Sequence, residues 1–241
     1  MSNATANKPA RRLGPVRLSV LILAAIAILV VSGSGFYTDV LWFNQLGYGD
    51  VFTTGIWARA AVFAAAAITF GGLTWASLYV AYRSRPIYSR VGEVSEFFAP
   101  YRELVDALRR IALVVVPLAF GLIAGGSAAS QWSVVLAWFN RSYVGDADPQ
   151  FGLDTGFYLF DLPFLTALCG FLSIALLVST LLGTFVHLIY GNVKFVGRGA
   201  KISKVARIQI SVSAGAYLLV QAATLWLDQY STLTSATGLF T

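Results

Sequence analysis

The sequence has a single cysteine and a single histidine among its 241 residues. Cys169 lies inside an apolar run, so the chain cannot build a disulfide framework or a thiolate metal cluster by itself. His187 has no second histidine to join it, which excludes a multi-histidine metal site within the chain. We therefore expect no resident metal and no cofactor.

Charged residues are also scarce. They make up 12% of the chain, whereas a soluble domain carries about 25%. Hydrophobic residues account for 57%, so the expected surroundings are lipid. The net charge of +6 does not indicate a nucleic-acid binder, because the basic residues stand in short loops between apolar runs and not on one face of a soluble domain.

Five apolar stretches are long enough to cross a membrane. A helix of about 20 apolar residues spans the hydrocarbon core, where lipid cannot satisfy exposed backbone amides. The sequence predicts an all-α, polytopic α-helical membrane protein with about five transmembrane helices and amphipathic interfacial helices in the loops. We expect a basic cytoplasmic tail over residues 1–17, a helical bundle over 18–230 and an extracytoplasmic segment over 231–241. The expected spans are residues 18–37, 56–82, 111–130, 162–190 and 208–227.

The basic residues predict the orientation of these spans. Lys and Arg in short loops are retained in the cytoplasm, and 15 of the 17 lie in the N-terminal tail or in the loops after the second and fourth spans. Only Arg59 and Arg141 lie elsewhere. We expect a multipass protein of the inner (plasma) membrane with a cytoplasmic N-terminus and an extracytoplasmic C-terminus. The first span also resembles a signal peptide, but its apolar run is long and no clear Ala-x-Ala site follows, so a retained span is favoured.

Two connecting segments have the periodicity of helices that lie in the membrane interface. The outer one places on one face Trp132, Val135, Leu136, Phe139 and Tyr143. The cytoplasmic one has Pro100 as a break or first-turn residue and repeats at helical spacing Val94, Phe97, Phe98, Tyr101, Leu104, Val105 and Leu108. This inner helix is either a docking surface for a partner or anionic lipid, or ordinary interfacial packing, which is the favoured interpretation.

Two ionisable residues in the spans are candidates for function. Arg59 lies at the outer end of the second span, where it can snorkel or pair with an outer acid; contact with a substrate or an ion is the alternative. His187 lies near the cytoplasmic end of the fourth span. Because no other buried ionisable group accompanies His187, we expect an interfacial histidine and not a proton relay.

Small and polar residues in the spans predict contacts between helices. Gly121 and Gly125 form a small-xxx-small pair in the third span, which favours close helix packing, and Pro117 is a candidate kink in the same span. Gln209 and Gln221 in the fifth span prefer helix contacts or a polar cavity to lipid, and hydrogen bonding between helices is the favoured interpretation.

The outer loops hold three aspartates that we treat as candidate functional residues, Asp148, Asp154 and Asp161. Asp146 and Asp148 could offer carboxylates to a divalent cation, but aspartates are also common in turns and helix caps. An EF-hand alignment from Asp146 fails, because Phe157 falls where the bidentate glutamate belongs. The sequence also lacks the common phosphate-loop, dinucleotide, zinc-protease and nucleophile-elbow motifs. No catalytic, cofactor-binding or metal-binding residue is predicted.

Three blocks of the sequence resemble uncharacterised protein family 0182. The first contains Leu41-Trp42-Phe43, Leu46-Gly47-Tyr48 and Val51-Phe52. The second consists of Asp148-Pro149-Gln150-Phe151-Gly152, Asp154 and the run Gly156-Phe157-Tyr158-Leu159-Phe160-Asp161-Leu162-Pro163-Phe164; the third is Trp226-Leu227-Asp228-Gln229-Tyr230. The resemblance covers nearly the whole chain. It implies a large multipass protein of actinobacteria and some other bacteria, with a long extracytoplasmic portion and two further spans beyond the N-terminal membrane region that this chain matches.

The favoured function is a membrane anchor or assembly subunit of a cell-envelope membrane complex, contacting the lipid bilayer and possible membrane protein partners or a second copy of the chain. This follows from helix-packing glycines, interfacial helices and aromatic outer loops without a catalytic constellation. A transporter or channel component is the first alternative, motivated by Arg59 and the polar fifth span. A membrane enzyme acting on envelope lipids or polyprenyl-linked sugars is the second, motivated by Asp148.

Overall fold

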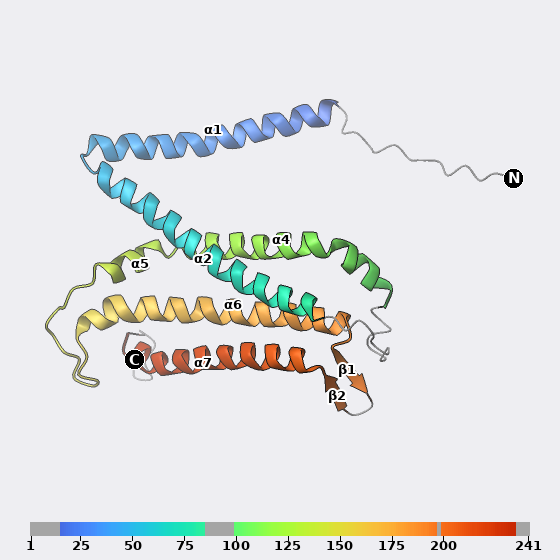
Figure 1. Ribbon diagram of the computed structural model, residues 1–241. Helices are drawn as coiled ribbons and strands as arrows, with labels where there is room; N and C mark the ends of the chain where they lie inside the picture. The colour runs from blue at the N-terminus through green and yellow to red at the C-terminus, as the bar shows by residue number, and fades with distance from the viewer. Residues whose placement is uncertain (1–14, 85–98, 197–198, 235–241) are drawn as a thin grey trace, which may run out of the picture. The chain divides into compact units, whose positions relative to one another are not determined.

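The computed structural model describes residues 15–84, 99–196 and 199–234. It confirms the expected all-helical membrane-type architecture, with five helices that are long and apolar enough to cross a membrane. The elements in chain order are α1 (Pro15–Gln45), α2 (Gly49–Arg83), α4 (Ala99–Ala129), α5 (Trp132–Phe139), η1 (Phe157–Asp161), α6 (Leu162–Ile189), β1 (Val193–Val196), β2 (Gly199–Ile202) and α7 (Lys204–Thr234) (Figure 1). The membrane-crossing candidates are Ile22–Gln45, Gly49–Arg83, Ala107–Ala129, Phe157–Ile189 and Lys204–Thr232.

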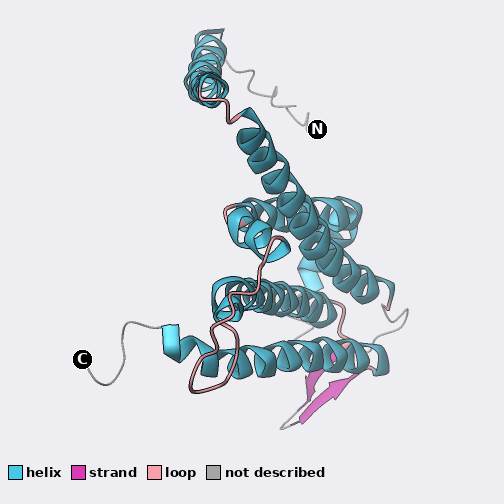
Figure 2. Ribbon diagram, turned by 90° about the vertical axis from the view of Figure 1, so that its left-hand side faces the viewer, coloured by secondary structure: helices cyan, strands magenta, loops and turns pink. Residues whose placement is uncertain are grey.

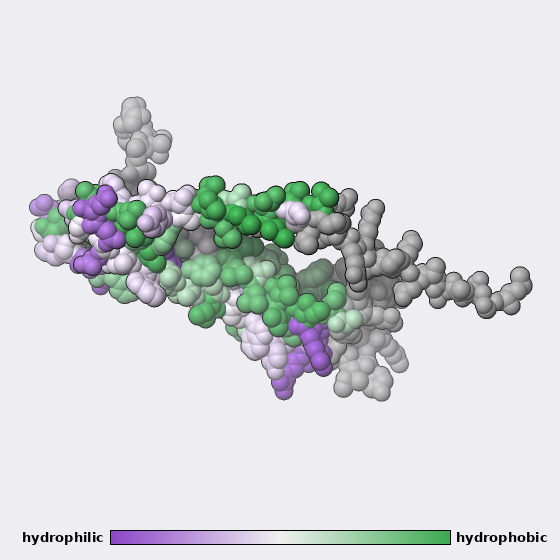
Figure 3. Space-filling model, turned by 90° about the horizontal axis from the view of Figure 1, so that it is seen from above, coloured by the Kyte–Doolittle hydropathy of each residue, from purple (hydrophilic) through white to green (hydrophobic). Residues whose placement is uncertain are grey.

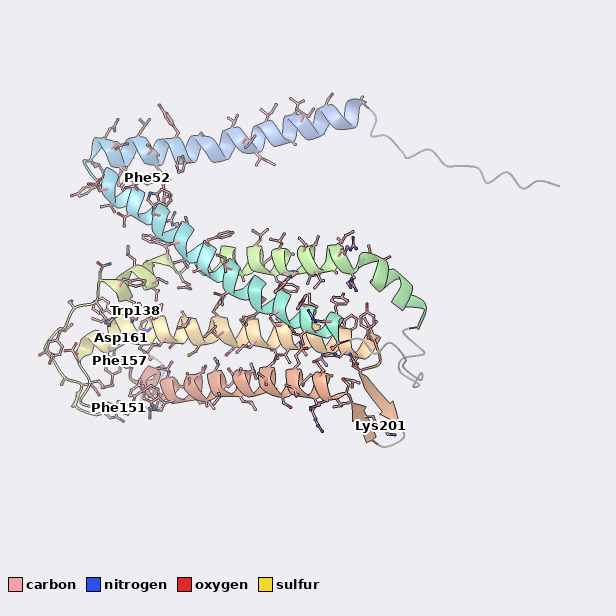
Figure 4. All side chains as sticks on the ribbon, in the orientation of Figure 1. Phe52, Trp138, Phe151, Phe157, Asp161 and Lys201 are labelled. Atoms are coloured by element: carbon pink, nitrogen blue, oxygen red, sulfur yellow. The ribbon has the colours of Figure 1, made fainter. Side chains whose placement is uncertain are left out.

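The chain forms two compact units, Met1–Thr54 and Gly55–Thr241, which are described separately. The first contains α1, the turn after it and the start of α2. Gly47 has a φ of +77°, a conformation that favours glycine, and the turn is closed by the Tyr48 backbone N–H donating to the Phe43 carbonyl at 2.9 Å. The Phe52 ring (Figure 4) packs on Phe43 and Phe36 at centroid distances of 5.2 and 5.7 Å. Aromatic contacts therefore hold the end of α1 against the first turn of α2.

The second unit has its hydrophobic core where α2, α4 and α6 meet. The buried members are Leu78, Ala81 and Tyr82 of α2 together with Val186 and Tyr190. Leu113 and Val116 of α4 and Leu182 of α6 pack against them. Elsewhere the helices expose large apolar side chains, and hydrophobic residues cover much of the surface seen in Figure 3. Such exposure is what a lipid-facing helix requires.

Helices α6 and α7 lie side by side, as Figures 1 and 2 both show. Two side-chain hydrogen bonds join them within their apolar length: Ser173 donates to Gln221 at 2.8 Å, and His187 contacts Gln209 at 2.9 Å. The expectation that Gln209 and Gln221 form hydrogen bonds between helices is confirmed. Polar groups between packed helices are satisfied by each other because lipid offers them no partner.

A short β-hairpin joins α6 to α7, and the sequence did not predict it. Its strands pair antiparallel from Val193–Ile202 to Val196–Gly199. The Ser203 backbone N–H donates to the Asn192 carbonyl at 2.8 Å and closes the base of the hairpin. Figure 4 labels Lys201 on β2, and this side of the second unit is called the hairpin end. The opposite side, which carries α5 and η1, is called the α5 end.

The two expected interfacial helices are represented differently in the structure. The one expected after the third span is α5, a separate helix over Trp132–Phe139. The one expected before the third span is continuous with it, because α4 begins at Ala99 and runs to Ala129. Pro100 stands in its first turn, where a missing backbone N–H costs no hydrogen bond. Val94, Phe97 and Phe98 lie outside the described residues.

Candidate functional site

Asp154 organises the loop between α5 and η1. Its carboxylate accepts the backbone N–H groups of Gly145 at 2.8 Å, Gly156 at 2.7 Å and Val144 at 3.2 Å. Loss of hydration acts to raise the pKa of this carboxyl, but the three N–H donors outweigh it and hold the pKa below its ordinary value of 3.8. Asp154 is therefore ionised and links Val144 and Gly145 to Gly156 within the loop. These hydrogen bonds are called the Asp154 clasp.

Asp148 has a similar role earlier in the same loop. Its carboxylate accepts the backbone N–H of Phe151 at 2.6 Å and that of Gln150 at 3.2 Å, and the Tyr158 hydroxyl lies 3.3 Å from the same oxygen. This is the Asx-turn arrangement in which an aspartate side chain replaces a backbone acceptor. Gly152 follows with a φ of +65°. The Asp-x-Asp pattern thus forms a turn.

Asp161 ties α5 to the start of α6. The Trp138 indole Nε1–H donates to its carboxylate at 3.0 Å, and the Arg141 guanidinium lies 3.7 Å from the same oxygen. Trp138 also stacks on Phe164 with a centroid distance of 4.1 Å. Figure 4 shows Trp138 and Asp161 close together at the α5 end.

The three candidate carboxylates each have their own set of partners. Asp154 and Asp148 bind different backbone segments of the loop, whereas Asp161 binds side chains of α5 and the residues after it. Among the described residues, no group of three or more His, Cys, Asp or Glu side chains is placed to hold a metal ion. Each carboxylate has a structural role that its hydrogen bonds explain.

Tyr230 connects the end of α7 to the same loop. Its ring packs on Phe151 at 4.9 Å, on Trp226 at 5.2 Å and on Phe157 at 5.4 Å between centroids. Aromatic pairs of this kind each contribute about 0.5–1.5 kcal/mol beyond burial of their area. Figure 4 places Phe151 and Phe157 beside this end of the bundle. These rings pack the loop against the end of α7. They are called the aromatic cluster, which consists of Phe151, Phe157, Trp226 and Tyr230.

Arg59 lies on the exposed surface of α2 and stacks over Trp132 of α5. The guanidinium carbon is 5.0 Å from the centre of the indole ring, within the range of a cation–π interaction. The same indole lies close to Gly55, where a Cβ would stand 3.6 Å from the ring. Within the described part of the chain, no ion pair or hydrogen bond engages the Arg59 side chain.

The predicted packing glycines lie at the crossing of α2 and α4. A Cβ on Gly121 would stand 2.8 Å from the Ala67 carbonyl oxygen, and one on Gly125 would stand 2.9 Å from that of Phe63. The backbones therefore approach too closely for any larger residue at either position. An apolar groove of about 430 Å³ runs along the same pair of helices beside Gly71 and Trp75.

His187 is fully buried within the protein, in the last turn of α6. The expectation that it lies at the depth of the membrane interface stays a prediction. The Nε2 of His187 lies 2.9 Å from Gln209 Oε1 and its Nδ1 lies 3.0 Å from the amide nitrogen of Asn192. The Gln209 amide in turn donates to the Ser77 carbonyl and hydroxyl, both at 3.0 Å. Asn192 also donates to the Ser84 carbonyl at 3.3 Å. Burial is possible because every ring nitrogen has a partner.

The polar chain continues along α2 and α6. The Ser77 hydroxyl donates to the Ser179 carbonyl at 2.6 Å, and the Thr74 and Ser179 hydroxyls are 3.3 Å apart. Gly183 makes this approach possible, since a Cβ there would collide with the Ser77 hydroxyl. We call this set the polar network; it consists of Thr74, Ser77, Ser179, His187, Asn192 and Gln209.

Comparison with known proteins places the chain in a family. The model of the family described as Uncharacterised protein family (UPF0182) matches residues 16–241. The chain belongs to this family. A UPF0182 protein of Clavibacter sepedonicus is 44% identical over 241 residues, which cover 99% of this chain and 24% of that relative. The UPF0182 protein of Kocuria rhizophila is 40% identical over 240 residues, which cover 100% of this chain and 24% of the relative.

The chain therefore spans about a quarter of the length of the curated UPF0182 relatives that it matches. No solved structure matches it. The second and third blocks that carry the family resemblance meet in the aromatic cluster, where Tyr230 contacts Phe151 and Phe157. In this UPF0182 chain the second and third blocks are thus parts of one structural unit.

The polar network was missed by sequence reasoning. Asn192 lies after the end of α6, and its contact with His187 depends on the turn that leads into the hairpin. Ser77 and Gln209 are separated from each other by more than a hundred residues. The available signal was the pair of polar residues His187 and Gln209 in adjoining apolar runs, which could have been paired by the rule that buried polar groups find partners.

Proposed function

We propose that this chain is a membrane anchor and assembly subunit of a cell-envelope membrane complex, with its N-terminus in the cytoplasm and the α5 end outside. The observation that carries the proposal is the ordered surface formed by η1 and the loop before it, where the carboxylates of Asp148, Asp154 and Asp161 all hold structural contacts. A carboxylate that already accepts backbone hydrogen bonds is poorly suited to general acid–base work or metal binding. Such a surface suits docking of another protein.

The exposed helices support the same proposal. In α7 only 6% of the most apolar window is buried within the structure. A membrane helix with so little buried surface contacts lipid or the helices of partners, and partner helices include those of a second copy of the chain. The orientation is supported by the clustering of Lys and Arg in the tail and in two loops.

The alternative functions receive less support from the contacts. A transporter would use polar residues of the bundle, but Gln209 and Gln221 are both bound to neighbouring helices. An enzyme acting on envelope lipids or polyprenyl-linked sugars would use Asp148, whose carboxylate accepts two backbone N–H groups. Residues in structural hydrogen bonds are not free to serve a moving substrate.

The test is affinity purification of tagged protein from actinobacterial membranes in mild detergent, with quantitative mass spectrometry of what copurifies. Wild-type protein and Asp146→Ala should retain the same stoichiometric partner, because the exposed Asp146 side chain makes no described contact. Asp154→Ala should lose that partner while remaining helical, because the loop loses its clasp. A chain that purifies alone in every case, without self-association, would rule out the assembly function.

A further inference from the structure

We propose that Arg59, held against Trp132, binds the phosphate of a phospholipid in the outer leaflet. The inference goes beyond the proposed function and uses from it only the orientation of α2. It begins from a contrast between the two basic residues that lie outside the tail and the basic loops, Arg59 and Arg141. Both stack on a tryptophan of α5, but they differ in what else they meet.

Arg141 has its charge compensated within the protein. Its guanidinium lies 4.9 Å from the centre of the Trp138 ring and 3.7 Å from the Asp161 carboxylate. It also donates to the Trp138 carbonyl at 3.3 Å. The stack on tryptophan is therefore accompanied by an acidic partner and a hydrogen-bond acceptor from the protein.

Arg59 has the same stack without the carboxylate. The distance to the Trp132 ring is 5.0 Å, and the described residues supply its side chain with neither an acidic partner nor a hydrogen-bond acceptor. Stacking covers one face of the guanidinium and leaves its edge N–H groups free. That edge presents donors in the fork that matches two oxygens of a phosphate.

The position of Arg59 along α2 fits the depth of lipid phosphates. Arg83 lies at the other end of the helix, where it stacks on Tyr79 at 5.9 Å and donates to the tyrosine hydroxyl at 2.8 Å. At 1.5 Å per residue the two arginines are about 36 Å apart. This exceeds the roughly 30 Å hydrocarbon core and remains within the roughly 40–45 Å that includes the headgroups. Along the axis of α2 the two arginines are therefore separated by a length close to one bilayer thickness.

The neighbours of Arg59 also suit the headgroup layer. Trp57 is 73% exposed, and Trp132 and Trp138 of α5 lie at the same end. Tryptophan is enriched at this depth because its ring is apolar and its N–H is polar. An arginine among these rings, without an internal counterion, is complementary to the phosphodiester that every phospholipid supplies.

The experiment measures lipid retention by native mass spectrometry of the purified chain released from nanodiscs of phosphatidylglycerol. Wild-type protein should retain phospholipid, and Arg59→Gln should retain about tenfold less, since a paired charge-assisted contact is lost. Arg141→Gln is the matched control and should retain as much as wild type. Trp132→Phe should keep most of the retention and Trp132→Leu should lower it, because only the former preserves the stack.

Two further arms identify the source of the phosphate and guard against misfolding. Dihexanoyl-phosphatidylglycerol should compete for the site, whereas inorganic phosphate and phosphate-free dihexanoylglycerol should not. Circular dichroism should show equal helicity in all variants. Phospholipid retention by Arg59→Lys, which keeps the charge without the fork, should fall between that of wild type and that of Arg59→Gln.

Equal retention by wild type and Arg59→Gln, equal loss in Arg59→Gln and Arg141→Gln, or competition by inorganic phosphate overturns the proposal. None of these outcomes bears on whether a protein partner copurifies, so the two proposals fail independently.

Discussion

Nε2 of His187 and Oε1 of Gln209 are 2.9 Å apart, and this contact joins α6 to α7 inside the apolar bundle. The amide nitrogen of Asn192 at 3.0 Å from Nδ1 can only donate, so Nδ1 must accept and Nε2 must carry the proton. His187 is thus held as one neutral tautomer between two amides. His187 therefore connects α6, α7 and the turn before the hairpin.

Replacement of His187 should destabilise the bundle through its partners. His187→Leu leaves the Gln209 carbonyl and an Asn192 N–H without partners in a buried setting, which costs about 1–3 kcal/mol each. The double variant His187→Leu/Gln209→Leu should be less destabilised than the sum of the singles, with a coupling of about 0.5–3 kcal/mol. Denaturation in mixed micelles, followed by circular dichroism, measures these differences. Strict additivity would show that the contact carries no stability.

Substitution at Gly121 should disturb the crossing of α2 and α4. Gly121→Ala places a Cβ 2.8 Å from the Ala67 carbonyl oxygen, and the helices must separate at a cost of about 1–3 kcal/mol. Gly126→Ala is the control, because a Cβ there meets no atom within 4 Å. Melting temperatures in detergent should fall for the first variant and stay level or rise for the second. The reverse order would refute the packing account, which applies equally to Gly125.

The aromatic cluster should control the order of the loop between α5 and η1. Tyr230→Leu removes three ring contacts, each of which contributes about 0.5–1.5 kcal/mol. Hydrogen exchange of the amides from Asp148 to Tyr158 should become faster. Tyr143→Leu, at a side chain that is 82% exposed, should leave the exchange rates of the same amides unchanged. Equally faster exchange in both variants would show that the aromatic cluster does not control the order of the loop.

The Asp154 clasp should make the loop sensitive to acid. Because its pKa is lowered in the folded loop, the carboxylate stabilises the loop at pH values above 3.8, and this contribution is lost as the pH falls below 3.8 through the folded pKa. Hydrogen exchange of the amides of Val144, Gly145 and Gly156, corrected for the intrinsic pH dependence of exchange, should therefore lose protection in strong acid. Asp154→Asn should already have lower protection of these amides at neutral pH and should change less on acidification. A pH profile that is the same in both proteins would contradict the assignment.

The proposed orientation can be measured with single cysteines. Cys169→Ser removes the native thiol, after which Tyr143→Cys at the α5 end should react with a membrane-impermeant maleimide on intact cells. Lys201→Cys in the hairpin should react only after the membrane is permeabilised. Labelling in the opposite order would invert the orientation.

The membrane architecture was predictable because it depends on long apolar runs, which are local in the sequence. The hairpin was not, because each of its strands has four residues and its base is closed by a contact between Asn192 and Ser203. Gly121 and Gly125 were identified from their spacing alone, since small residues at helical intervals have few other uses. The partners of the aspartates are set by the tertiary fold and not by local pattern. For His187 the polar residues of adjoining apolar runs indicated Gln209 alone, because the contact with Asn192 depends on the turn into the hairpin.

The π-helical turn η1 has a consequence for chain length. Its hydrogen bond runs from the Leu162 N–H to the Phe157 carbonyl, so the turn accommodates one residue more than an α-helix would. At the start of the turn Phe157 contacts Tyr230 of α7, and after the turn Phe164 stacks on Trp138 of α5. Deletion of one residue here would restore regular helix but rotate one ring by about 100° relative to the other. The number of residues in this segment is therefore constrained. Many point substitutions would be tolerated here more readily than the insertion or deletion of a single codon.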